Sequence, residues 1–225
     1  QERLEEGLIE AAKDCYAPPG RFRADRQWTA IISPYIRFGE LSVRYVYWRC
    51  RQALPFELRN LFIKRLFWRD RAYSQLFKFP DSADVSIRKQ YESQWWSGTR
   101  LGLKRWQRGM TGFPLVDAAM RQLWKVGWMC NHLRHVTAQF LIEHLDISWK
   151  DGLKWYDYTL VDTDLAINAM MWQMGGHSGC GAWNFVMHPV FAGKKVDPEG
   201  AYVRRWLPEL AHLPVEYIHC PWEAP

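Results

Sequence analysis

Apolar side chains recur at helical spacing along most of the chain, in segments separated by proline, glycine and polar clusters. Residues 1–16 form a charged amphipathic pattern that ends at Pro18-Pro19-Gly20, because consecutive prolines remove backbone donors and fix φ. Further helical patterns cover residues 33–53, 56–79, 114–129, 133–145 and 164–174. No alternating pattern typical of a strand is longer than about four residues, and no internal repeat occurs. The pattern therefore predicts an all-α fold.

Short polar side chains mark where these segments begin. Ser33 and Asp164 are suited to cap the helices that they open. Residues 81–112 are polar and contain glycine, so we expect mostly loop with short helices there, although three tryptophans in this stretch need something to pack on. Beyond Gly176 the chain is rich in glycine, proline and aromatic residues. We expect irregular structure there, with one short helix over residues 202–206.

The chain of 225 residues is long enough to bury a sizeable core, and no stretch has the composition of a linker. We therefore expect one helical domain over residues 1–225. Its 30 lysines and arginines against 24 aspartates and glutamates give a net charge of +6, which favours an anionic partner such as DNA without requiring one. No apolar run is long enough for a membrane span, so we expect no membrane partner.

The cysteines and histidines argue against a metal centre. The five cysteines are odd in number and far apart, and they never form a C-x-x-C pair. This argues against a disulfide framework and against a zinc site. His132 and His135 lie at helical spacing without acidic or thiol ligands beside them, so we expect no metal. Free thiols predict an intracellular, reducing compartment, with nucleus or organelle left open.

The segment 164–174 is apolar on nearly all sides except for one stripe. Asp164, Asn168 and Trp172 are four residues apart and therefore share a helical face. A buried polar group without a partner costs about 1–3 kcal/mol, so this stripe needs partners. Either a planar heterocycle with ring donors and acceptors supplies them, or Asp164 caps the helix and Asn168 bonds to neighbouring backbone.

A second polar group lies close to this stripe in the sequence. Asp162 and Asp164 are neighbouring carboxylates in an apolar setting, and Arg134 is a cation available to them. A buried pair of arginine and carboxylate is costly unless it is well hydrogen-bonded. The pair therefore indicates either a functional site or a structural ion pair. The 14 tryptophans leave a similar choice between planar-ligand stacking, electron transfer and an indole-rich core.

Linked motifs in unbroken order give these residues a context. They are Trp106-x-x-Gly109-x-Thr111-Gly112-x-Pro114, Gly127-Trp128-Met129-x-Asn131-x-x-Arg134, Trp149-x-x-Gly152, Asp162-x-Asp164-x-Ala166-x-Asn168-x-x-x-Trp172 and Asp197-Pro198-x-Gly200-x-Tyr202-Val203-Arg204-Arg205-Trp206. Together they resemble the flavin domain of the photolyase and cryptochrome family, over roughly residues 29–225. The resemblance implies a multi-helix FAD-binding domain of this type. The N-terminal α/β antenna domain of the family is expected to be absent from this chain.

The resemblance also implies which residues hold FAD. They are Thr29 and Ser33 at the diphosphate, Arg69 in contact with the cofactor, Arg134 paired with Asp162 beside the isoalloxazine ring, Asp164 at the ring edge, and Asn168 facing the N5 nitrogen. The amides that open the helix after Ser33 suit an anion. Ala30 stands where the family often has serine, so one phosphate contact is expected to be missing.

The same resemblance implies an electron relay of three tryptophans between the surface and the photoexcited flavin. Trp172 would lie nearest the ring, Trp149 next and Trp96 outermost. Together with Asn168 these are the predicted catalytic residues. The protein fixes the separations between the rings, whereas the photochemistry belongs to the cofactor. Met174 stands where the family commonly has a second aromatic residue.

For the substrate, Trp68, Asn131 and His135 match family positions beside the cavity that receives a flipped DNA lesion. Arg65 replaces a glutamate that contacts cyclobutane dimers in bacterial-type enzymes. His135 matches the second of two active-site histidines in (6-4) photolyases, while Asn131 stands where the first should be. The lesion type is therefore left open.

The predicted function is an FAD-dependent, light-driven DNA photolyase or a photolyase-like flavoprotein, which transfers an electron to a pyrimidine photoproduct in damaged DNA. The alternative is a cryptochrome, a blue-light photoreceptor that signals through protein partners without repairing DNA. Asn168 favours the photolyase, since plant cryptochromes usually have aspartate there. A helical nucleic-acid-binding module without flavin would explain the charge and the tryptophans, but not the stripe that Asn168 shares with Asp164 and Trp172.

Overall fold

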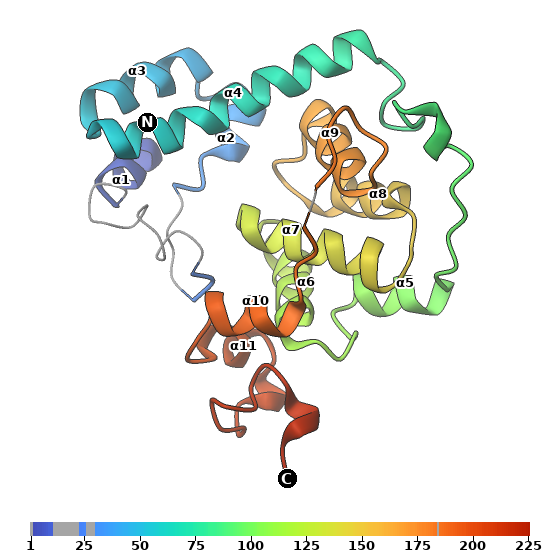
Figure 1. Ribbon diagram of the computed structural model, residues 1–225. Helices are drawn as coiled ribbons and strands as arrows, with labels where there is room; N and C mark the ends of the chain where they lie inside the picture. Colours follow the sequence, from blue (N-terminus) through green and yellow to red (C-terminus); the bar gives the residue numbers. More distant parts are fainter. Residues whose placement is uncertain (1, 11–22, 26–29, 184) are drawn as a thin grey trace.

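The computed structural model describes residues 2–10, 23–25, 30–183 and 185–225, and every regular element in these ranges is helical (Figure 1). The α-helices are α1 (Glu2–Glu10), α2 (Ser33–Arg37), α3 (Val43–Ala53), α4 (Phe56–Lys78), α5 (Arg100–Gln107), α6 (Pro114–Val126), α7 (Asn131–Gln139), α8 (Trp149–Thr159), α9 (Leu165–Gly175), α10 (Pro189–Val196) and α11 (Ala201–Trp206). A π-helical turn, Phe140–His144, continues α7. The all-α prediction is confirmed. None of the described helices is both long and apolar enough to cross a membrane.

Two cores hold these helices together. Helices α1, α3 and α4 pack around Leu4, Val46 and Leu66. A larger core joins the helices from α5 to α11 and includes the fully buried Leu123 and Leu141. Burying a side chain of this size contributes about 1.5–3 kcal/mol, so the two cores fix the two groups of helices firmly.

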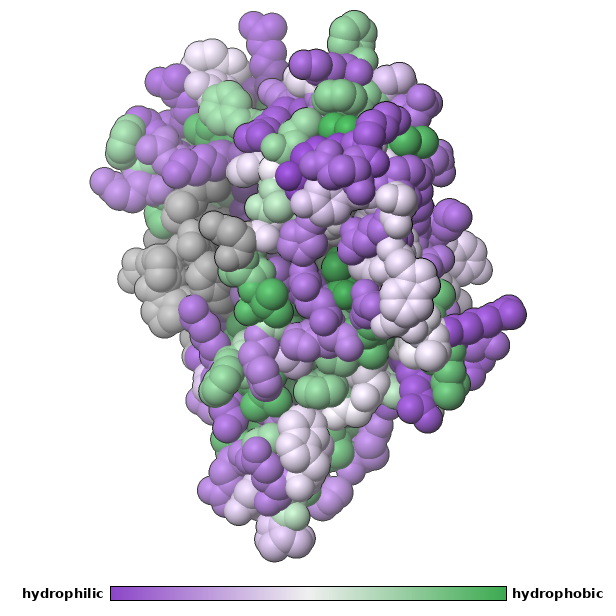
Figure 2. Space-filling model, turned by 45° about the vertical axis from the view of Figure 1, so that its right-hand side comes forward, coloured by the Kyte–Doolittle hydropathy of each residue, from purple (hydrophilic) through white to green (hydrophobic). Residues whose placement is uncertain are grey.

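The long helix α4 and the buried helix α9 connect the two groups. Ala72 of α4 packs against Ala166 and Met170 of α9, and α9 also packs along α8. In Figure 1, α4 crosses the top of the molecule and α9 lies below it. Helices α3 and α4 form the upper end of the molecule in Figure 2, and the side chains exposed there are mostly hydrophilic. Lys64 and Arg71 of α4 are among the exposed basic residues.

The predicted helix over residues 33–53 is wrong in one respect, because it is two helices. Gly39 adopts φ +77° after α2, a conformation that glycine reaches without a steric penalty. Ser42 then caps α3 by accepting a hydrogen bond from the Tyr45 amide at 3.4 Å. Ser33 is the first residue of α2 and not its cap, since Ile32 holds the cap position without a side-chain bond.

The sequence also missed one helix near the C-terminus. Irregular structure was expected after Gly176 apart from residues 202–206, but residues 189–196 form α10. Pro189 opens this helix, where its missing N–H costs nothing, and Ala192 and Val196 are buried against α6. So short a helix depends on tertiary packing, which periodicity alone does not report.

The remaining boundaries follow the prediction closely. The 56–79 and 164–174 segments are α4 and α9, and the 114–129 segment is α6, which ends where Gly127 adopts φ +72°. The 81–112 stretch holds the short α5, as expected. At the N-terminus, α1 covers only the first part of the 1–16 prediction, and the rest lies outside the described residues. A single domain over the whole chain stays a prediction.

Candidate cofactor site

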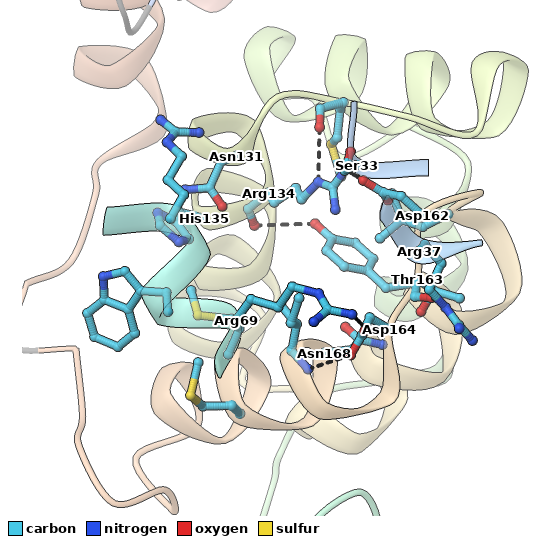
Figure 3. Close-up of a pocket in the computed structure, with 18 of the residues that line it drawn as sticks. Ser33, Arg37, Arg69, Asn131, Arg134, His135, Asp162, Thr163, Asp164 and Asn168 are labelled. Carbon is cyan, nitrogen blue, oxygen red and sulfur yellow. Dashed lines mark hydrogen bonds and ion pairs between the residues drawn. The ribbon is translucent and has the colours of Figure 1, made fainter. Parts of the chain in front are cut away.

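A cavity of about 580 Å³ lies between α2, α4, α7 and α9 and the segment that precedes α9. This volume falls in the usual range for small-molecule and cofactor sites. Figure 3 shows labelled polar side chains from all of these elements arranged around it. Apolar side chains, among them Leu66, Ile167 and Met170, form much of the remaining wall. The cavity therefore combines an apolar wall with a few convergent polar groups, as a planar ligand with polar edges requires.

Asp164 occupies the start of α9 and faces the cavity. Its Oδ1 accepts hydrogen bonds from the amides of Ala166 (3.1 Å) and Ile167 (3.2 Å), which makes it the N-cap. Its Oδ2 accepts a bond of 2.6 Å from the Tyr73 hydroxyl, and the Arg69 guanidinium lies 3.8 Å away. The predicted cap is confirmed, and the same carboxylate also lines the cavity. The two interpretations of Asp164 are therefore compatible.

Asn168 and Trp172 complete the stripe on α9. The Asn168 amide nitrogen donates to Asp157 Oδ1 at 2.6 Å and to the Leu153 carbonyl at 3.2 Å. The indole of Trp172 is 2 % exposed. Both residues line the cavity together with Asp164. The spacing thus predicted correctly that the three share one wall, although it did not identify Asp157 as the partner that fixes the amide.

Arg134 and Asp162 form the predicted ion pair at the cavity wall. Arg134 Nη2 lies 2.8 Å from Asp162 Oδ2, and Arg134 Nε donates to the Met129 carbonyl at 2.9 Å. The Asp162 side chain is 3 % exposed, and its Oδ1 accepts no hydrogen bond from any described residue. A buried acceptor left in this way costs about 1–3 kcal/mol. Asp162 is therefore an acceptor suited to a donor from a bound molecule.

The segment around α2 forms the neighbouring part of the wall. Ser33 Oγ accepts a hydrogen bond of 3.2 Å from Trp128 Nε1, and Arg37 donates through Nε to the Thr163 carbonyl. Ile31, which also lines the cavity, has φ +46°, a conformation that costs a β-branched residue about 1–3 kcal/mol. Ser33 lies where the prediction requires it. Thr29 lies outside the described residues.

The two inner relay tryptophans are buried, and the outermost is partly exposed. Trp172 and Trp149 are each 2 % exposed, and Trp96 is half-buried at the edge of the same core. Two hydrogen bonds connect the segment after Trp96 to the turn before α8. The Ser97 amide donates to Asp146 Oδ2, and the Gly98 amide donates to the Asp146 carbonyl, both at 2.9 Å. This arrangement holds Trp96 near the helix that carries Trp149.

The predicted substrate residues are all part of the cavity wall. Trp68, Asn131 and His135 all line the cavity, as does Arg65. Trp68 is 44 % exposed, and the Arg71 guanidinium lies 5.1 Å from the centre of its ring. An exposed indole with a cation beside it suits a base that enters from solvent.

His135 differs from an ordinary surface histidine. Its ring lies 4.8 Å from that of Trp183, edge to face, and its Nε2 has no hydrogen-bond partner among the described residues. Burial, together with nearby His132, Arg65 and Arg134, lowers the pKa of His135 to about 4. His135 is therefore neutral at physiological pH and presents an imidazole, not a cation, to the cavity.

Sequence reasoning missed Tyr73, Asp157 and Tyr156. Tyr73 bonds to Asp164, Asp157 bonds to Asn168, and Tyr156 lies edge to face with Trp172 at 4.9 Å. Tyr73 follows Arg69 by one helical turn, so spacing on α4 could have placed the two on one face. Nothing in the sequence could have shown that this face meets α9.

Comparison with known proteins agrees with this architecture. The family model described as the FAD binding domain of DNA photolyase matches residues 62–225. A deoxyribodipyrimidine photo-lyase of Agrobacterium fabrum is 41 % identical over 203 residues, covering 88 % of this chain and 42 % of that protein. Cryptochrome-2 of Arabidopsis thaliana is 36 % identical over 240 aligned residues, covering 100 % of this chain and 38 % of that protein. The chain thus spans less than half the length of these relatives.

Solved structures show the same fold. A bacterial class III photolyase from Agrobacterium tumefaciens superposes with a TM-score of 0.93 at 38 % identity, covering 100 % of this chain and 47 % of that one. An archaeal photolyase from Sulfolobus tokodaii, solved with two FAD molecules, gives 0.87 at 28 % identity, covering 98 % and 50 %. With a family match over most of its length, this chain belongs to the FAD-binding domains of the photolyase and cryptochrome family, and its cofactor is FAD.

Proposed function

We propose that this chain is the FAD-binding and electron-transfer part of a light-driven DNA photolyase that acts on a pyrimidine photoproduct. One observation carries the proposal: Asp164, Asn168 and Trp172 line a cofactor-sized cavity, and the core that buries Trp172 also buries Trp149 and has the half-buried Trp96 at its edge. A nucleic-acid-binding module without flavin would need neither the polar stripe nor the difference in burial between Trp149 and Trp96.

The described residues fit FAD. Asp162 Oδ1 is a buried acceptor without a partner, and Arg69 and Arg134 bring positive charge to a cavity with an apolar wall. A donor on the cofactor would satisfy Asp162, while Arg69 suits its phosphates. When bound, FAD would supply a ring that absorbs blue light and exchanges single electrons. The residues around it bind the ring, orient it and exclude water.

Trp172, Trp149 and Trp96 would act in series as the path for electrons from the surface. Trp172 and Trp149 are shielded from water, which keeps the rings in fixed positions. Trp96 is half-buried, so an external reductant can approach it. The proposed direction is inward, from Trp96 to Trp149 to Trp172, with the positive charge moving outward at each step.

Damaged DNA is the proposed substrate, because the side of the cavity with Trp68 and Arg65 is both aromatic and cationic. A flipped base could stack on Trp68, which is worth about 1–3 kcal/mol per base, while basic side chains such as Lys64 and Arg71 neutralise phosphates. A damaged base costs less to flip than an intact one, so the cavity would select lesions.

Signalling as a cryptochrome is the second candidate function, and it rests on the relative named Cryptochrome-2 at 36 % identity. The same cavity and tryptophans would serve it, with protein partners in place of DNA. We also propose an intracellular, reducing setting, a proposal supported by the free thiols of Cys50, Cys130, Cys180 and Cys220.

The test is repair itself. The FAD-loaded, reduced protein is illuminated with DNA that carries cyclobutane dimers or, separately, (6-4) products, and the products are analysed. Light-dependent restoration of either lesion supports the photolyase and identifies its substrate. Normal flavin photoreduction with no repair and no preference for damaged DNA overturns the photolyase in favour of the cryptochrome.

A further inference from the structure

Tyr73 lies between a cation and a carboxylate of the cavity wall without lining the cavity itself. Its hydroxyl donates to Asp164 Oδ2 at 2.6 Å and accepts from Arg69 Nη2 at 3.3 Å. The Arg69 guanidinium also lies 4.6 Å from the centre of the tyrosine ring. The direct separation of Arg69 from Asp164 is longer, at 3.8 Å, so the phenol connects the two charges.

We propose that Tyr73 is a positioning residue for the cofactor. Its hydrogen bonds leave Asp164 with a single acceptor position for a ring N–H group, and they join α4 to α9 at the cavity. The inference rests on the proposed function of the same site. It assigns to Tyr73 a role through Asp164 and Arg69, and not a direct contact with the cofactor.

The acceptor positions of the Asp164 carboxylate limit what it can bind. A carboxylate has about four lone-pair positions. Three positions on Asp164 are filled from within the protein, by the amides of Ala166 and Ile167 and by the Tyr73 hydroxyl. One position on Oδ2 remains. The edge of an isoalloxazine ring offers one N–H donor between two carbonyl groups, so one acceptor matches one donor.

The Tyr73 hydroxyl also fixes the orientation of the Asp164 carboxylate. The two amide bonds fix Oδ1 of Asp164 to the first turn of α9, and the Tyr73 bond then fixes the rotation of the carboxylate. Without the phenol, Oδ2 would be free to turn toward the Arg69 guanidinium. A hydrogen bond to a charged group contributes about 1.5–3 kcal/mol, which is enough to hold one orientation.

Tyr73 also orients the Arg69 guanidinium. A guanidinium has five N–H donors, and one of those on Arg69 is used by Tyr73. The stacked position over the Tyr73 ring fixes the plane of the guanidinium, and the side chain lines the cavity at 24 % exposure. The remaining donors are thereby held toward an anionic group such as a phosphate. Tyr73 thus orients one acceptor and one cation for the same ligand.

The protonation state of Tyr73 is consistent with this role. The hydrogen bond to Asp164 and partial burial raise the pKa of the Tyr73 hydroxyl, against the opposing effect of Arg69 and Arg37. The phenol therefore remains a donor at neutral pH.

The experiment compares FAD binding by the parent protein, Tyr73→Phe and the control Tyr158→Phe, an exposed tyrosine on α8 that lies outside the cavity wall. FAD is removed, added back and followed by flavin fluorescence. We expect FAD affinity about tenfold weaker in Tyr73→Phe, together with a shifted flavin absorption band, and no change in Tyr158→Phe. Circular dichroism should show the parent helix content in both, because phenylalanine keeps the ring that packs under Arg69.

A double-mutant cycle separates positioning from a structural role. Asp164→Asn should weaken FAD binding, and adding Tyr73→Phe to it should weaken binding much less than in the parent background. The inference would be overturned if Tyr73→Phe lowered FAD affinity equally in the parent and Asp164→Asn backgrounds. It would also be overturned if Tyr73→Phe bound FAD with the affinity and flavin absorption of the parent. The proposed function would stand in both cases. A parent protein that binds no FAD would overturn the proposed function and the inference with it.

Discussion

Gly152 of α8 lies directly against the indole of Trp172 on α9: a Cβ atom at position 152 would stand 2.2 Å from Trp172 Cη2. The contact is reciprocal, since a Cβ atom at Gly176 would stand 2.4 Å from Trp149 Cδ1. Thus Gly152 of α8 makes room for the tryptophan of α9, and Gly176, the C-cap residue of α9, makes room for the tryptophan of α8. This interlock brings α8 and α9, and the two inner tryptophans, closer than any larger residue allows.

Gly152→Ala should displace Trp172 and destabilise the protein by about 1–3 kcal/mol, because overpacking outweighs the gain in helix propensity. It should also slow light-driven flavin reduction. Urea unfolding and photobleaching of the flavin measure the two effects. Gly181→Ala is the matched control, since a Cβ atom there meets nothing within 4 Å. If Gly152→Ala has the same free energy of unfolding as the parent protein, α8 and α9 do not depend on this close contact.

Asp162→Asn should lower FAD affinity and reduce the free energy of unfolding by about 2–3 kcal/mol, because Arg134 loses its counter-charge while partly buried. FAD titration and urea unfolding are the measurements. For comparison, Glu209→Gln removes the surface pair between Arg121 and Glu209, whose carboxylate is 51 % exposed, and should cost less than about 1 kcal/mol. Similar losses in both variants would contradict a special role for the buried pair.

His135 should make stability depend on pH. Its pKa falls from 6.5 in the unfolded chain to about 4 in the folded protein, so its contribution is complete above pH 6.5 and is lost as the pH falls to about 4. His135→Asn should therefore flatten the decline in stability over this window, by about 3 kcal/mol at its lower end. Unfolding curves at several pH values test this, with exposed His212→Asn as control. An unchanged decline in His135→Asn would be inconsistent with a lowered pKa.

Trp68→Ala should remove the preference for damaged DNA, by about tenfold in the affinity ratio, and leave binding to undamaged DNA nearly unchanged. Both affinities must be measured at one salt concentration, because phosphate contacts weaken as salt rises. Trp124→Ala, an exposed tryptophan outside the cavity wall, should keep the preference. Equal losses on damaged and undamaged DNA would assign Trp68 to general binding.

Much of the site was predictable because its central residues lie on one helix. The period of α9 places Asp164, Asn168 and Trp172 on one face, and the charges of Arg134 and Asp162 require a partner. The helical class follows from the same periodicity. These features are local, or follow from the cost of burying charge.

What the sequence could not predict depends on contacts between distant elements. Tyr73 acquires its role only because α4 packs on α9, and Asp157 only because α8 does. The helix α10 forms because α6 covers it, and the break before α3 depends on a left-handed Gly39. Periodicity in one segment carries no information about the segment that will cover it.

The proposed route carries electrons to FAD in this cavity through Trp172. Its most direct test is the yield of light-driven flavin reduction with an external donor in Trp172→Phe, measured by transient absorption beside the parent and Trp124→Phe. Trp124 is 62 % exposed and stacks on Trp155 away from the cavity wall, so its variant controls for the loss of an indole. We expect near-complete loss of reduction in Trp172→Phe and an unchanged yield in Trp124→Phe. An unchanged yield in Trp172→Phe would rule out Trp172 as the route to the flavin.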